Sequence, residues 1–129
     1  MAEIGSGGNG LVAGFFPDEG QQAYVGYDAP NTGDDQLILW KPINYSPLPA
    51  NTQVVTFSVL MGFVDSTTNR YDDFYWSVYN NDIDLLFTIN FRNDDLRIYY
   101  ALDGTNQFVW TGQTFAHEVS YELVVTMNF

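Results

Sequence analysis

The chain has 129 residues, a formal net charge of −12 from 16 acidic and 4 basic side chains, and no cysteine. This length supports one domain with its own core. The charge argues against nucleic acid and anionic membrane surfaces as partners, because both attract clustered lysine and arginine. The lack of cysteine excludes disulfides and zinc–thiolate sites. Neutral ligands such as sugars, and divalent cations, remain open.

Residues 1–10 are dominated by the run Gly5-Ser6-Gly7-Gly8-Asn9-Gly10, and their composition predicts a flexible linker or an artificial tail. No secretory signal is visible in this segment. No apolar run of about 18 residues occurs, so we expect no membrane insertion. The domain proper is therefore predicted to span residues 11–129, with a C-terminus that is a candidate for being incomplete.

The segment 11–52 is the least regular part of the chain. Residues 37–40 (Leu-Ile-Leu-Trp) predict a strand, and the prolines at 42, 47 and 49 predict an extended connection after it. From residue 54 onward, apolar and polar residues alternate with a period of two, which is typical of strands with one buried face. The alternating segments are 55–63, 74–79, 85–91, 96–100 and 121–129.

Short polar clusters separate these segments at 80–82, 93–95 and 103–106. Asparagine, aspartate and glycine favour the tight turns of antiparallel hairpins. The sequence therefore predicts an all-β domain built as an antiparallel two-sheet sandwich.

The order of the strand-like segments carries a family resemblance. Its elements are Thr56–Val59, Phe74–Tyr79, Leu86–Phe91, Leu96–Tyr100, Phe108–Thr111 and Tyr121–Phe129. This order resembles the concanavalin A-like lectin/glucanase domains, a jelly-roll family that includes LamG-like modules of large bacterial surface proteins. The resemblance implies a jelly-roll fold, a location outside the cell or on its surface, and a carbohydrate ligand.

Domains of that family continue beyond the strand that 121–129 resembles, whereas this sequence stops at Phe129 on the apolar phase of its alternation. A sheet edge left open exposes unpaired N–H and C=O groups, which natural domains cover. We therefore expect the C-terminal strand to be completed by a second copy of the chain or by a separate complementing chain. The alternative is that residues 11–52 cover this edge.

Catalysis is not predicted. The glucanases of the family place acids in a Glu-x-Asp-x-x-Glu pattern on one strand, and retaining hydrolysis needs two carboxylates about 5–5.5 Å apart. The nearest run, from Asp82 to Phe87, lacks the third acid and begins in a turn. The single histidine, His117, stands beside Glu118 and is predicted to be a surface residue.

Acidic pairs at strand ends make calcium a candidate ion, because calcium binds six to eight oxygens supplied by such loops. The proposed ligands are Asp72, Asp73, Asp94 and Asp95, with Asp82 and Asp84 in similar positions. The alternative interpretation is that these acids solvate the turns. No contiguous calcium-binding loop of the Asp-x-Asp-x-Asp-Gly type is present.

An aromatic sheet face is the candidate ligand-binding site. If Phe74, Trp76 and Val78 face the core, the intervening tyrosines face the other way. The predicted ligand-binding residues are Tyr75, Tyr79, Asn90, Arg97 and Tyr99. Tyrosine offers a flat apolar ring with a polar tip, which suits stacking on a sugar. The alternative is that these tyrosines pack beneath missing strands.

Three functions follow from these observations. The first is a non-catalytic extracellular binding module, with carbohydrate as its ligand. The second is a structural or adhesive domain that binds protein and is completed by strands of another chain. The third and weakest is a glycoside hydrolase.

Overall fold

The computed structural model describes residues 2–4, 9–25, 38–40, 54–65, 73–102, 105 and 107–128. In this part of the chain the regular structure consists of strands, with no helix. The strand pairs whose register is defined are antiparallel. The all-β antiparallel character predicted from the alternation is thus confirmed, whereas the jelly-roll topology stays a prediction.

The contacts divide the chain into two compact units, where the composition favoured a single domain. The first unit holds residues 1–56 and 126–129. In it, β1 (Ala2–Ile4) pairs with β4 (Ile38–Trp40), and β2 (Asn9–Ala13) pairs with β3 (Gln21–Val25). Of the strand predicted at 37–40, residues 38–40 form β4, and Leu37 lies outside the described residues. Residues 2–4 and 9–10, predicted to be a flexible tail, lie in strands instead, because each finds a partner that sequence periodicity does not reveal.

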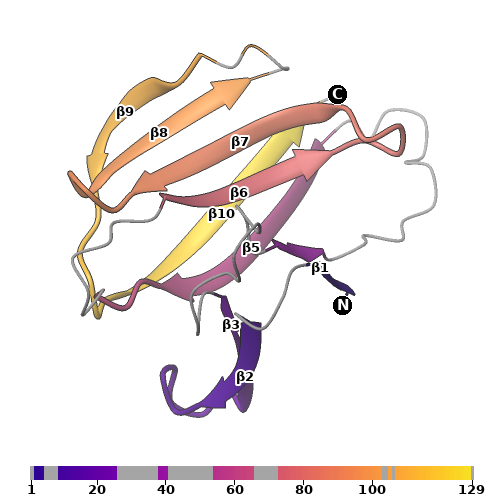
Figure 1. The fold of residues 1–129 in the computed structure, drawn as a ribbon. Coiled ribbons are helices and arrows are strands. Elements are labelled where there is room, and N and C mark those ends of the chain that lie inside the picture. The colour runs from indigo at the N-terminus through magenta and orange to yellow at the C-terminus, as the bar shows by residue number, and fades with distance from the viewer. Residues whose placement is uncertain are drawn as a thin grey trace. The chain divides into compact units, whose positions relative to one another are not determined.

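The second unit holds residues 57–125 and contains the strands labelled β6 to β9 in Figure 1. Its strands are β5 (Val54–Gly62), β6 (Asp73–Tyr79), β7 (Leu85–Arg92), β8 (Arg97–Leu102), β9 (Val109–Thr114) and β10 (Ser120–Asn128), of which β5 and β10 also extend into the first unit. Strands β6, β7, β8 and β9 form a four-stranded sheet in chain order, and β5 is hydrogen-bonded to β10 in a two-stranded sheet. Sequential order is expected, because the polar clusters between these strands are short enough for hairpins.

Three phenylalanines form the core of the second unit. Phe63, which follows β5, lies with its ring centroid 4.8 Å from that of Phe91 and 4.6 Å from that of Phe115. Phe63 also contacts Phe74 of β6 at 5.4 Å. Phe63, Phe74 and Phe91 occupy the apolar phase of their segments, so burying that phase brings the β5 segment against the four-stranded sheet.

The register of the sheet decides which residues share its two faces, because residues directly opposite each other point the same way. Phe91 lies between Phe74 and Ile98 on the core side. We call the opposite side the outer face. Its rows across the strands are Asp73–Arg92–Arg97, Tyr75–Asn90–Tyr99–Trp110 and Ser77–Thr88–Ala101.

Candidate functional site

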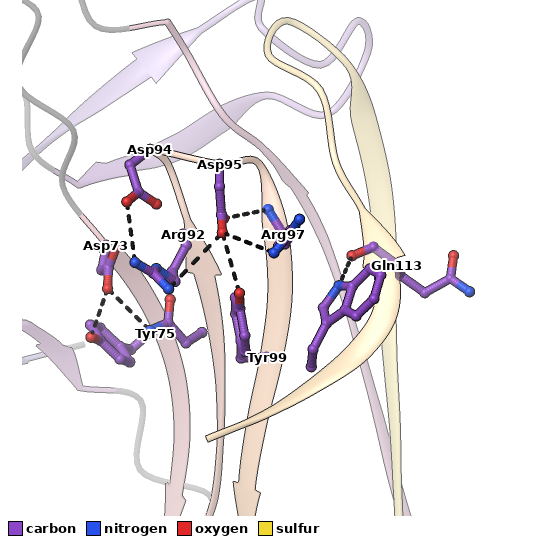
Figure 2. Close-up of polar contacts among 10 residues, drawn as sticks. Asp73, Tyr75, Arg92, Asp94, Asp95, Arg97, Tyr99 and Gln113 are labelled. Carbon is purple, nitrogen blue, oxygen red and sulfur yellow. Dashed lines mark hydrogen bonds and ion pairs between the residues drawn. The ribbon is translucent and has the colours of Figure 1, made fainter. Parts of the chain in front are cut away.

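The outer face of the β6–β9 sheet gathers the polar and aromatic side chains that the sequence singled out (Figure 2). We call this group the outer-face cluster. It comprises Asp73 and Tyr75 of β6, Asn90 and Arg92 of β7, Asp94 and Asp95 of the following turn, Arg97 and Tyr99 of β8, Phe108, and Trp110 of β9. The alternation of each strand places the strand residues of this group on the same side of the sheet, while Asp94, Asp95 and Phe108 join them through the contacts described below.

Asp73 joins the first two strands of the cluster. One of its carboxylate oxygens accepts a hydrogen bond from the Tyr75 hydroxyl and another from the Asn90 amide nitrogen, both at 3.1 Å. Partial burial of the phenol raises the pKa of Tyr75 above its ordinary value, and the negative charge of Asp73 raises it further. Tyr75 therefore stays a neutral hydrogen-bond donor.

The two arginines of the cluster are paired with the two aspartates of the β7–β8 turn. Arg92 lies 3.1 Å from an Asp94 oxygen, and this charge is the main cause of a raised pKa for the Arg92 guanidinium. Arg97 lies 3.8 Å from an Asp95 oxygen. These are exposed pairs, so each side chain is held loosely, but neither arginine presents an unbalanced positive charge.

The guanidinium groups also lie over aromatic rings. Arg92 is 5.4 Å from the ring centre of Tyr99, whose hydroxyl donates to Asp95 at 3.2 Å. Arg97 is 5.0 Å from the ring centre of Trp110. Cation–π contacts of this kind are weakly favourable at exposed positions. Each arginine of the cluster therefore contacts both a carboxylate and an aromatic ring.

Three aromatic side chains of the cluster remain open to solvent. Tyr75 is 54% exposed, Trp110 is 50% exposed, and Phe108 is also exposed. The rings of Tyr75 and Phe108 are 6.2 Å apart between centroids and are tilted by 58°. Exposed aromatic rings above a polar sheet face are suited to stacking on a flat, partly apolar ligand.

The floor beneath these rings is polar and buried. Thr88 is buried, and its hydroxyl lies 2.7 Å from that of Ser77. Asn90 is only 4% exposed, and its side-chain oxygen Oδ1 has no hydrogen-bond partner in the described part of the chain. Buried carbonyl groups are rarely left without a donor, because the loss of hydration is then uncompensated. This oxygen is the most unusual feature of the face.

The structure brings together most of the predicted ligand-binding residues. Tyr75, Asn90 and Tyr99 lie in one row, and Arg97 lies in the next row. Tyr79 is separated from them by a register shift between Val78 and Tyr79, which follows from the extra residue in β7 at that point.

Sequence reasoning missed three members of the cluster. Arg92 follows Thr88 and Asn90 on the same phase of its strand, so the alternation could have identified it. Trp110 and Phe108 could not be assigned, because Val109 between them is also apolar and the local phase is ambiguous.

The predicted calcium ligands are only partly placed. Asp72 lies outside the described residues. The described part of the chain contains no group of three or more histidine, cysteine, aspartate or glutamate side chains arranged to hold a metal ion. Asp94 and Asp95 are directed at Arg92 and Arg97, and Asp73 accepts from Tyr75 and Asn90. Calcium binding stays an untested prediction.

The acids of the Asp82–Phe87 run lie at the β6–β7 hairpin. The side-chain oxygen of Asn80 accepts hydrogen bonds from the N–H groups of Asp82 and Asp84, at 2.9 and 2.8 Å. Asp84 also accepts from the Asn80 amide at 3.1 Å. Both acids are exposed, and their contacts are those of a turn.

His117, predicted to be a surface residue, is partly buried. Its Nε2 atom is hydrogen-bonded to the buried side chain of Asn93, and its Nδ1 atom lies 3.4 Å from Asp65. The histidine thereby ties the β7–β8 turn to the segment after β5. Nothing in the chain's periodicity predicts this contact.

The chain matches no protein-family model, no curated protein and no solved structure with which it was compared. Where the structure describes the chain, it contains no helix of the length and apolarity required to cross a membrane.

Proposed function

We propose that this protein is a non-catalytic carbohydrate-binding module of lectin-like, jelly-roll type that acts outside the cell. Its ligand lies on the outer face of the β6–β9 sheet. The observation that carries the proposal is the continuous row Tyr75–Asn90–Tyr99–Trp110 across all four strands of that sheet, with exposed rings at both ends.

A row of this kind suits an extended sugar chain. The apolar C–H faces of pyranose rings stack on exposed aromatic rings, while hydroxyl groups exchange hydrogen bonds with neighbouring polar side chains. The cluster supplies both groups at once, with Tyr75 and Trp110 as stacking surfaces, Asn90 between them, and Asp73 beside Tyr75 in the adjacent row. Because the sheet is a rigid scaffold, the backbone positions that carry these side chains are set before a ligand arrives.

The proposal is tested by titrating the chain with soluble polysaccharides, followed by affinity electrophoresis or calorimetry. We expect Tyr75→Ala and Trp110→Ala each to weaken binding by about tenfold or more, which corresponds to the loss of one stacking contact. Tyr100→Ala is the matched control, because Tyr100 is also partly exposed but lies on the core side of β8. Equal losses in all three variants, or no binding by the parent chain, would contradict the proposal.

A second candidate function is supported by a different observation. Beyond the phenylalanine core, the core-side positions of β8 and β9 are exposed, with Leu102 at 57% and Val109 at 50%, next to Tyr100. Exposed apolar patches beside an edge strand are typical of protein interfaces. They favour a structural or adhesive domain completed by strands of another chain.

Size-exclusion chromatography with light scattering tests this second candidate. It predicts an assembly larger than the 14.6 kDa chain, which Leu102→Glu returns to a monomer. A parent chain that is monomeric at all concentrations would contradict it.

A further inference from the structure

The strongest unexplained feature of the molecule is the Asn90 side chain. Its Nδ2 atom donates to Asp73, and this bond fixes the orientation of the amide, because a flipped amide would place its oxygen against a carboxylate. The oxygen Oδ1 consequently faces away from Asp73. It is buried and has no donor among the residues that the structure describes.

The charges of the outer-face cluster limit what that donor can be. Each arginine already has a carboxylate partner, Asp94 for Arg92 and Asp95 for Arg97. The remaining acceptors are the Asn90 carbonyl and the Asp73 carboxylate. A ligand that carries acidic groups would meet acceptors and negative charge here, in a chain whose net charge is −12. A ligand rich in hydroxyl groups supplies donors without adding charge.

The side chains around Asn90 determine how a ligand can reach its Oδ1 atom. Tyr75 and Tyr99 flank it, Tyr75 and Phe108 are exposed, and side chains of that kind change rotamer within nanoseconds. Rotation of an exposed ring is the movement by which we expect a ligand to reach the floor between them. A hydroxyl group can then enter while the rest of a sugar ring stacks on the aromatic surface.

We propose that Asn90 is the specificity-determining residue of this face: its buried Oδ1 accepts a hydrogen bond from a hydroxyl of a neutral sugar, beside the stacking ring of Tyr75. This inference rests on the proposed carbohydrate-binding function and narrows its ligand to uncharged glycans. A site that is built to satisfy a buried polar group discriminates strongly against ligands that leave that group unpaired.

The test uses the full chain and two sets of polysaccharides. The neutral probes are laminarin, xylan and hydroxyethyl cellulose, and the acidic probes are polygalacturonate and alginate. Asn90→Leu removes the carbonyl and keeps the side-chain size close, whereas Asn90→Ser removes it without adding apolar bulk. Thr88→Val is the matched control, since Thr88 is buried on the same face of the same strand and its hydroxyl is already paired with Ser77.

We expect at least one neutral probe to bind and both acidic probes to bind at least about tenfold more weakly. We expect Asn90→Leu and Asn90→Ser to lose that binding by about tenfold or more, while Thr88→Val retains it. The unfolding midpoint of each variant shows whether it is folded, and Asn90→Ser replaces Asn90→Leu if the latter is not.

The outcomes separate this inference from the function on which it rests. If neutral probes bind, Tyr75→Ala weakens them and the folded Asn90 variants bind like the parent chain, the carbohydrate-binding function stands and the role of Asn90 is wrong. If acidic probes bind as tightly as neutral ones, the selectivity for neutral sugars is wrong. If no probe of either set binds, the proposed function itself fails.

Discussion

The two faces of the β6–β9 sheet are formed by alternate residues of the same strands, yet they are filled by different chemistry. On the core side, Phe91 packs against Phe63 and Phe115, and all three are buried. On the outer face, the residues buried to the same degree include Asn90 and Thr88, which are polar. Neighbouring positions along β7 thus bury a phenyl ring on one side and an amide on the other.

The apolar core side contributes mainly to stability, whereas the polar outer face is the proposed binding surface. The core side needs only apolar area and close packing, which many sequences supply. Burying polar groups gains less, and burying the Asn90 carbonyl without a partner costs free energy. A protein keeps such a residue where local stability is exchanged for a specific task. The outer face is therefore the surface on which the proposed ligand would bind.

Removal of a phenyl ring from the core should produce the largest difference between the two faces. Phe63→Ala should lower the free energy of unfolding by about 3–5 kcal/mol, because it leaves a cavity among three other rings. Urea denaturation measures this change. Leu60→Ala is the control on the preceding strand, where the side chain is exposed, and should change stability by about 0.5 kcal/mol or less. Equal effects of the two substitutions would break the assignment of the core.

In the polar floor of the outer face, a substitution should lower stability through an unpaired hydroxyl group and not through a cavity. Thr88→Val should cost about 1 kcal/mol, because it leaves the Ser77 hydroxyl without its partner. The double variant Ser77→Ala/Thr88→Val should recover part of that loss, since both partners are then apolar. The same denaturation measurement checks both. A double variant as unstable as the sum of the single ones would show that the hydroxyl pair is not the relevant interaction.

A smaller effect is expected in alkaline solution. The pKa of Tyr75 is raised by burial and by Asp73, so folding favours the neutral phenol. Its contribution to stability is fully present below the unfolded pKa of about 10 and is lost as the pH rises through the higher folded value.

Tyr75→Phe should remove this part of the pH dependence, as measured by unfolding midpoints across that range. Asp73→Asn should lower the pKa of Tyr75, as measured by the difference in phenolate absorbance between each protein and its Tyr75→Phe form. An unchanged phenolate titration in Asp73→Asn would show that the contact between the two residues does not persist in solution.

The smallest effect is expected at the rim of the outer face. Arg92→Gln removes an exposed ion pair with Asp94, and such pairs contribute little because water already solvates both charges. The unfolding midpoint should be indistinguishable from that of the parent chain. A clear loss of stability would mean that the rim supports the fold, and the contrast between the two faces would then be weaker than proposed.

The alternation of apolar and polar residues was enough to predict most strands of the second unit and most of one face of its sheet. A period of two is read directly from the chain, because successive side chains of a strand point to opposite faces. It gave the segments around β5, β6, β7, β8 and β10, and it placed Tyr75, Asn90, Arg97 and Tyr99 on a common phase. The turn clusters gave their connections for a similarly local reason.

Strand pairing, register and burial could not be predicted in this way, because they depend on which strands become neighbours in space. In the first unit, Ala2–Ile4 pairs with Ile38–Trp40, a partner far along the chain that the local pattern does not reveal. The register across β6–β9 put Trp110 beside Tyr99, and the bulge separated Tyr79 from the cluster. Only the packing of the whole face left the Asn90 oxygen buried without a donor, because burial and hydrogen bonding are properties of neighbours in space.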